Sequence, residues 1–378
     1  MAEKKTTLRS YLKWIYILLL YYTGTLALAK RWVLSKGAIV LTFHRVLSDS
    51  AAAQTCSPAG LIMKRQTFEA LLKFLKDNYL LVDLGAGIPA ATTDRIPVAI
   101  TFDDGWEDNV STAFPIVSAL KVPITIFICP ELIDTPMPFW PEQIIALFRS
   151  AGERADGLER ICSVLTASGY PEWAMVLPTA KNSACDALIT RLKSISTEER
   201  RRVLKSLLSC GVLPDDYADG TVDRTMSWSQ ISELQKAAVT FGSHTLHHEI
   251  LTVLPANEAE REIRESKAAI DERVNPCSLF SYPNGDASPA LRHVVARCGY
   301  EHAFINSPGV WRKQDDPLLI PRINLSEGTV TGPNGTFSRR AFEHRVFWNA
   351  FMHRRRARQS HRPDACEISA AVEKFNTL

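Results

Sequence analysis

The stretch Ile100-Thr101-Phe102-Asp103-Asp104-Gly105-Trp106 contains the strongest single signal in the chain. The apolar segment 96–102 predicts a buried β-strand that ends in two adjacent carboxylates, after which Gly105 turns the chain. In α/β folds, catalytic and binding groups gather at the carboxyl ends of the strands. Two carboxylates so close repel each other and raise one pKa unless a cation lies beside them. The stretch therefore predicts a metal site whose other ligands come from elsewhere in the chain.

The composition is that of an ordinary globular protein. The chain has 378 residues, 46% hydrophobic and 22% charged, which suits one large domain or one domain with insertions. A net charge of +3 is too small to indicate nucleic-acid binding. The eight cysteines include no Cys-x-x-Cys pair, which argues against a disulfide framework or a thiolate metal site and favours a reducing compartment.

Strand and helix patterns alternate along most of the chain. Besides 96–102, apolar segments predict strands at 37–46, 79–84, 122–128, 238–243, 278–282, 302–305 and 319–323. Helical spacing occurs at 66–75, 110–120, 256–273 and 289–298. This alternation predicts an α/β fold with a parallel sheet. Between about 136 and 224 the patterns are helical only, which predicts a helical insertion on one face of the sheet that could serve as a lid.

The two ends of the chain differ from this pattern. In 1–35, basic residues flank a mostly apolar run from Trp14 to Ala29, which is shorter than the roughly 20 residues of a transmembrane helix. Three interpretations stay open: a membrane-associated helix, a signal peptide, and an amphipathic helix packed on the domain. We expect the domain itself to occupy 36–330 and the basic segment 331–378 to be a partly disordered tail.

A histidine pair follows the predicted strand at 238–243. His244 and His248 are four residues apart, so on a helical turn their imidazoles share a face. Two histidines and one carboxylate make an open divalent-metal site. A lone His-x-x-x-His is most often structural, but here it shares its strand-end position with Asp104. The pattern therefore predicts a metal site built from Asp104, His244 and His248.

Three motifs in order resemble those of the NodB-homology polysaccharide deacetylases, carbohydrate esterase family 4, of the exopolysaccharide-associated type. They are Thr101-Phe102-Asp103-Asp104-Gly105, Ser243-His244-Thr245-Leu246-His247-His248 and Leu279-Phe280-Ser281-Tyr282-Pro283-Asn284-Gly285. The resemblance implies a distorted (β/α) barrel and a metal-dependent hydrolase that removes acetyl groups from sugars. It implies Asp104, His244 and His248 as metal ligands and Asp103 as the general base.

The third motif indicates where substrate binds. A backbone N–H near Asn284, after Tyr282 and Pro283, resembles the family's oxyanion donor, and the Tyr282 ring could stack on a sugar. The arginine that often opens this motif is absent, and Ser281 holds its place. Arg322 could orient Asp103 instead, although a structural ion pair is an equal interpretation.

The general acid is the least determined group. The family's usual Leu-x-His near the C-terminus is missing. His44, at the end of the first predicted strand, is the candidate to protonate the leaving amine, and a structural core histidine is the alternative.

The predicted function is hydrolysis of acetyl groups on an N-acetylated polysaccharide or glycolipid. The cofactor is a divalent metal, zinc by its chemistry, with Co²⁺, Ni²⁺ or Mn²⁺ as alternatives. Other functions remain open: a degenerate carbohydrate-binding or scaffold protein of an export system, or a hydrolase of non-sugar amides. A bacterial-type cell envelope or membrane surface is the expected location, with the cytoplasm as the alternative.

Overall fold

The computed structural model describes residues 8–33, 37–87, 95–135, 139–177, 184–213, 222–274 and 276–353. Its centre is a parallel sheet whose neighbouring strands run in the order β10-β9-β8-β7-β6-β5-β1-β11. The strands are Ile39–Phe43 (β1), Pro97–Phe102 (β5), Thr125–Ile128 (β6), Thr240–Ser243 (β7), Leu279–Ser281 (β8), His302–Ile305 (β9), Ile320–Pro321 (β10) and Ile323–Asn324 (β11). A short strand, Leu80–Val82 (β4), pairs with the first half of β5.

One extended segment brings the two ends of this sheet together. β10 pairs with β9 and β11 pairs with β1, and only Arg322 separates β10 from β11. The sheet therefore curves into a nearly closed barrel with fewer than eight complete units, and the predicted fold class, a distorted (β/α) barrel with a helical insertion, is confirmed.

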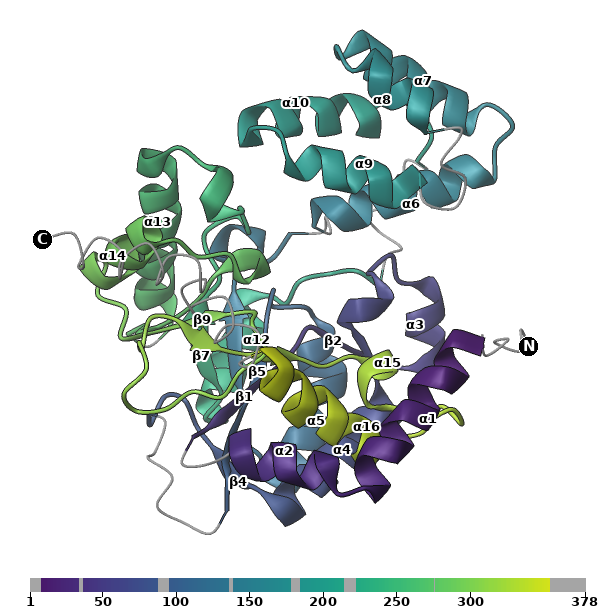
Figure 1. Ribbon diagram of the computed structural model, residues 1–378. Helices are drawn as coiled ribbons and strands as arrows, with labels where there is room; N and C mark the ends of the chain where they lie inside the picture. Colours follow the sequence, from purple (N-terminus) through teal and green to yellow (C-terminus); the bar gives the residue numbers. More distant parts are fainter. Residues whose placement is uncertain are drawn as a thin grey trace, which may run out of the picture.

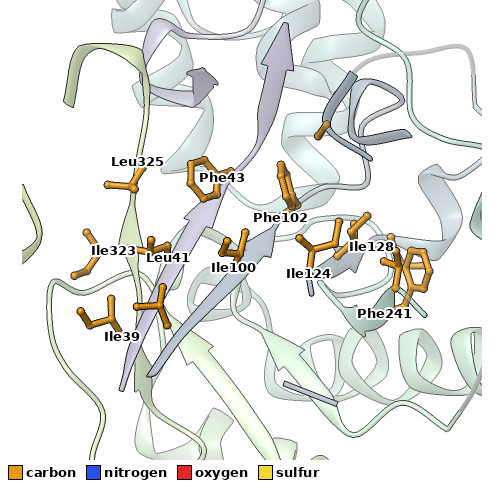
Figure 2. Close-up of a cluster of buried hydrophobic side chains, with 14 of the residues drawn as sticks. Ile39, Leu41, Phe43, Ile100, Phe102, Ile124, Ile128, Phe241, Ile323 and Leu325 are labelled. Carbon is orange, nitrogen blue, oxygen red and sulfur yellow. The ribbon is translucent and has the colours of Figure 1, made fainter. Parts of the chain in front are cut away.

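Alternation along the strands divides the side chains into two layers. Ile39, Leu41 and Phe43 of β1, with Ile100 and Phe102 of β5, belong to the large outer core, where helices cover the barrel. Figure 2 shows this row of apolar side chains crossing neighbouring strands. The intervening positions, such as Val40 and Ala99, belong to a smaller inner cluster with Phe127 and Phe304.

Helices of the predicted apolar spacing cover the outer layer. The main ones are Arg65–Asn78 (α4), Phe114–Leu120 (α5), Ala256–Arg273 (α13) and Pro289–Arg297 (α14). In α4, the residues at helical spacing, Phe68, Leu71, Leu72 and Leu75, are all buried. The helix Trp228–Lys236 (α12) was not predicted from the sequence. It begins with a capping box between Ser227 and Gln230. Two further strands, Arg45–Leu47 (β2) and Ile62–Lys64 (β3), pair beside the barrel, with Asp49–Gln54 (α3) nearby.

The insertion has a hydrophobic core of its own. It contains Trp140–Gly152 (α6), Gly157–Ala167 (α7), Pro171–Val176 (α8), Ala184–Lys193 (α9) and Thr197–Leu208 (α10). Their apolar faces bury a separate cluster that includes Leu147, Leu165, Leu188 and Val203. Figure 1 shows these helices together above the barrel. They fall inside the predicted range 136–224. Within that range, residues 136–138, 178–183 and 214–221 lie outside the described residues. Whether they act as a lid stays a prediction.

The two terminal segments pack against each other. Leu8–Tyr22 (α1) contacts Arg339–Glu343 (α16), and Thr25–Val33 (α2) contacts the π-helical turn His344–Trp348 (η7), while Glu327–Val330 (α15) packs on α16. Figure 1 shows α1 beside α16. Residues 331–353, the first part of the predicted partly disordered tail, are structured, because Phe342 and Phe347 are fully buried and hold this part to the core. Residues 354–378 lie outside the described residues.

Candidate active site

The Asp103-Asp104 pair lies where β5 leaves the barrel, and the backbone separates the two carboxylates. Asp103 continues the strand alternation, so its side chain follows Thr101 towards the barrel interior, and its N–H donates to the Phe43 carbonyl. Asp104 then has φ = 76° and Gly105 has φ = 74°. A left-handed aspartate costs free energy and is characteristic of functional sites. The two adjacent anions therefore point to different surroundings.

Three metal-ligand groups converge at Asp104. Its Oδ1 lies 3.6 Å from His244 Nε2 and 3.4 Å from His248 Nε2. One ligand atom from each of the three residues lies within 4.8 Å of the others. Asp104 Oδ1 is buried and has no hydrogen-bond partner among the residues that the structure describes, whereas Oδ2 accepts a hydrogen bond from Trp106 Nε1 at 2.9 Å. A buried, unpartnered carboxylate oxygen facing two imidazoles fits a cation site.

The histidines reach this site from a loop, not from a helical turn. The segment after β7 is irregular, and both Thr245 and His248 have positive φ, 67° and 61°. The prediction that His244 and His248 lie together is correct, but its geometric reason is wrong. Left-handed residues curl the loop so that both rings turn back to Asp104, while His247 turns away and its Nδ1 lies 2.8 Å from Glu262 Oε1.

Hydrogen bonding and burial set the charge of these groups. His244 Nδ1 lies 2.8 Å from the Ser281 carbonyl, so Nδ1 carries the proton and Nε2 keeps its lone pair for the site. Burial lowers the pKa of His244 to about 4. Burial also opposes the charged forms of His248 and Asp104, but their mutual attraction outweighs it. The pKa of His248 is raised and that of Asp104 is lowered.

Asp103 is held by Arg322, the residue at the closure of the barrel. Arg322 donates to both oxygens of Asp103, at 2.7 and 2.6 Å, and both side chains are almost completely buried. It also donates to Ser281 Oγ at 2.8 Å. Burial alone would raise the pKa of Asp103, but the adjacent guanidinium and the nearby imidazoles lower it. The structure therefore places Arg322 against Asp103, beside the serine that holds the place of the motif's arginine.

His44 faces the same carboxylate from the end of β1. Its Nε2 lies 4.0 Å from Asp103 Oδ2, and His244 Nε2 lies 3.9 Å from that same oxygen. The Nδ1 of His44 is buried without a hydrogen-bond partner in the described chain. His44 is therefore brought to the site, next to Asp103.

The third motif, residues 279–285, does not present the Tyr282 side chain to solvent as expected. The Tyr282 side chain is fully buried against Phe280, so the suggestion that its ring stacks on a sugar is wrong for this structure. Pro283 is buried, and Asn284, with φ = 57°, is exposed at the turn that follows. Of this motif, the backbone around Asn284 is the part exposed to solvent.

Three groups of the site were missed in the sequence. Trp106 binds Asp104 through its indole N–H, and its position two residues after Asp104 was the only available signal. Phe139, just before α6, packs against both Trp106 and His248. Glu142 of α6 is buried and accepts a hydrogen bond from Ser57, and burial together with Asp104 raises the pKa of Glu142 to about 8. No sequence pattern joins the insertion to this site.

Comparison with known proteins agrees with this geometry. The family model described as Polysaccharide deacetylase matches residues 90–155 and 199–303. The gap in the match falls within the helical insertion. YxkH of Bacillus subtilis (strain 168), whose name classes it with the polysaccharide deacetylases, is 19% identical over 304 residues, which cover 79% of this chain and 75% of that protein.

Solved structures with a similar chain path include two deacetylase-related proteins. The Streptococcus pyogenes deacetylase PplD, solved in complex with acetate, is 16% identical, with 78% of this chain and 94% of that chain covered and a TM-score of 0.48. IcaB from Ammonifex degensii has the same identity, coverage and TM-score. The matched residues identify a polysaccharide deacetylase domain in this chain, and the Asp/His/His cluster lies at the strand ends of its parallel barrel.

Proposed function

We propose that the chain hydrolyses acetyl groups from N-acetylated sugars of a polysaccharide or glycolipid, and that it needs a divalent metal to do so. One observation carries the proposal: Asp103 and Asp104 are adjacent, yet only Asp104 leaves a buried oxygen unpartnered among imidazoles, while Arg322 binds both oxygens of Asp103. This difference supports Asp104 as the metal ligand and Asp103 as the general base.

Asp104, His244 and His248 would hold the metal. A carboxylate and two neutral imidazoles suit zinc, and cobalt, nickel or manganese accept the same ligands. A bound divalent ion acidifies water and polarises an acetyl carbonyl. Trp106, by donating to Asp104 Oδ2, leaves Oδ1 directed at the site.

Asp103 is the proposed general base. Arg322 keeps the Asp103 carboxylate ionised and fixes its orientation. Asp103 can therefore accept a proton from the attacking water. The water oxygen bonds to the acetyl carbon, the carbon–nitrogen bond breaks, and acetate and a free amine leave. His44, 4.0 Å from Asp103, is the proposed donor of the proton that the leaving nitrogen takes. A backbone N–H near Asn284 is the proposed donor to the developing oxyanion.

The test is the variant Asp104→Asn with the matched control Asp77→Asn, an exposed carboxylate on α4. We expect Asp104→Asn to lose bound metal and acetate release from an N-acetylglucosamine oligomer, and Asp77→Asn to keep both. Unchanged acetate release in Asp104→Asn refutes the proposal. Glycan binding without acetate release by the metal-loaded wild type would indicate a binding protein instead.

We also propose that α1 and α2 lie on a membrane surface of the cell envelope. Within the described residues no single helix has the length and composition to cross a membrane, although the pair Tyr11–Tyr22 and Thr25–Arg31 passes that test together, with a 70° bend between them. Ile17, Leu26 and Ala29 are buried against the rest of the chain, so these two helices are held to the protein. This supports a helix pair that lies flat on a membrane surface rather than one that crosses the membrane. Recovery of the full chain in the soluble fraction only, after cell lysis, would contradict this position.

A further inference from the structure

The outward face of α1 is apolar. Leu12, Ile15, Leu19 and Tyr22 follow helical spacing and are 57%, 51%, 59% and 71% exposed. A helix packed on a water-soluble domain normally turns polar residues outwards. The 15 residues of α1 span about 22 Å at 1.5 Å per residue, short of the roughly 30 Å of a hydrocarbon core. This face therefore suits the interfacial layer of a bilayer rather than its full thickness.

A pocket opens beside this apolar face. It has a volume of about 530 Å³ and is lined by Trp14 and Tyr21 of α1, by the segment before α16, including Asn334, and by Arg339 and Arg340 of α16 itself. Trp14 and Tyr21 are seven residues apart, so they lie on one side of α1, next to the exposed stripe. Tryptophan and tyrosine favour the level of lipid headgroups.

Arg340 gives this pocket an uncompensated positive charge. Its guanidinium lies 5.0 Å from the centre of the Tyr21 ring and 5.3 Å from that of Tyr22, and it donates to the Tyr22 hydroxyl. Its Nε is buried, and no described residue forms a hydrogen bond with it. Within the described chain, no carboxylate lies within ion-pair distance of Arg340.

The surroundings add to the positive charge. Glu343 is shared between Arg339, at 3.1 Å, and Lys30, at 3.4 Å, so this one carboxylate faces two other cations. Lys13 of α1 is exposed. An anion in the pocket would neutralise Arg340 and satisfy its Nε, and an apolar chain attached to that anion would run along the exposed face of α1.

We propose that this pocket binds the phosphate headgroup of an anionic phospholipid. The proposal rests on the membrane-surface position of α1, and it adds which lipid is recognised and by which residue. Figure 1 shows the helical insertion above the barrel and α2 at its lower side, so lipid binding at α1 and α2 leaves the insertion side open.

The experiment compares the full chain on vesicles of phosphatidylcholine alone and of phosphatidylcholine with phosphatidylglycerol, by co-sedimentation. We expect the wild type to bind the anionic vesicles at least ten-fold more tightly. Arg340→Gln should lose about five-fold of its affinity for the anionic vesicles and none for the neutral ones. The matched control Arg297→Gln removes an exposed arginine of α14 and should bind as the wild type does.

Two further variants separate charge from folding. Asn334→Asp adds a negative charge to the pocket while keeping the acceptor oxygen that binds Thr336, so it should also weaken anionic binding without unfolding the loop. Tyr22→Phe removes the hydroxyl that Arg340 binds but keeps the charge, and it should retain the anionic preference.

The outcomes distinguish the possible failures. Equal binding of the wild type to both vesicle types overturns the headgroup site and leaves the membrane-surface position intact, whereas binding to neither overturns both. Wild-type binding by Arg340→Gln and Asn334→Asp overturns the site. Displacement from anionic vesicles by millimolar inorganic phosphate, without loss of neutral binding, would assign the pocket to free phosphate instead. Acetate release from a soluble oligomer tests the proposed hydrolase separately.

Discussion

Removing the Arg322 side chain should be one of the most destabilising single changes in the barrel. Arg322 donates two hydrogen bonds to Asp103 and one to Ser281, and it is 1% exposed. In Arg322→Met, the Asp103 carboxylate remains buried without its cation. Breaking a buried ion pair from one side costs about 3–5 kcal/mol, whereas an exposed pair is worth about 0–1 kcal/mol. We therefore expect Arg322→Met to lower the free energy of unfolding by about 3–5 kcal/mol.

The assay is urea unfolding followed by tryptophan fluorescence at neutral pH. The matched control is Arg261→Met, because Arg261 pairs with Glu265 at 3.0 Å on the exposed face of α13. The double variant Asp103→Leu with Arg322→Met removes both charges, so it should be more stable than Arg322→Met alone. A cost below about 1 kcal/mol for Arg322→Met, equal to that of the control, would refute the view that this ion pair is buried and essential to the barrel.

Three other changes test separate parts of the site and of the fold. Trp106→Phe removes the hydrogen bond to Asp104, so the affinity for zinc, measured by chelator competition, should fall about 10–100-fold, and unchanged affinity would exclude this support. His44→Asn should lower kcat for acetate release by about 10²–10⁴-fold at unchanged metal content, and full activity would assign the proton transfer elsewhere. Burial lowers the pKa of His344 to about 4, so the unfolded chain binds this proton more tightly, and stability that is present above pH 6.5 is lost as the pH falls towards 4. His344→Gln should therefore lose less stability than the wild type between pH 7 and 4.5, whereas the exposed control His293→Gln should follow the wild type.

The sequence alone determined the order of the barrel strands. Each of β1 and β5 to β10 lies within a segment predicted from its apolar run, and β11 overlaps one, because a strand buried on both faces needs nearly continuous apolar residues. The same reasoning grouped Asp104 and His244, which follow predicted strands. Because the carboxyl ends of parallel strands meet at one edge of a sheet, polar residues at those ends meet as well.

Tertiary structure decided how these residues face one another. The left-handed backbone at Asp104 and His248 turns the proposed metal ligands together, and such loop dihedrals leave no periodic pattern in a sequence. The same holds for contacts between distant segments. Arg322 meets Asp103 only because β10 and β11 close the barrel, and Phe139 reaches His248 only because α6 begins above the strand ends.

The N-terminal helix shows the same division. Its sequence left a membrane helix, a signal peptide and a packed helix open, because an apolar run of this length suits all three. The structure divides the run between two sides: Ile17 and Leu26 are buried on the chain, while Leu12 and Leu19 face outwards. Which apolar residues a helix buries depends on the surface it packs against, and here that surface comes from residues 339–348, more than 300 positions later in the chain.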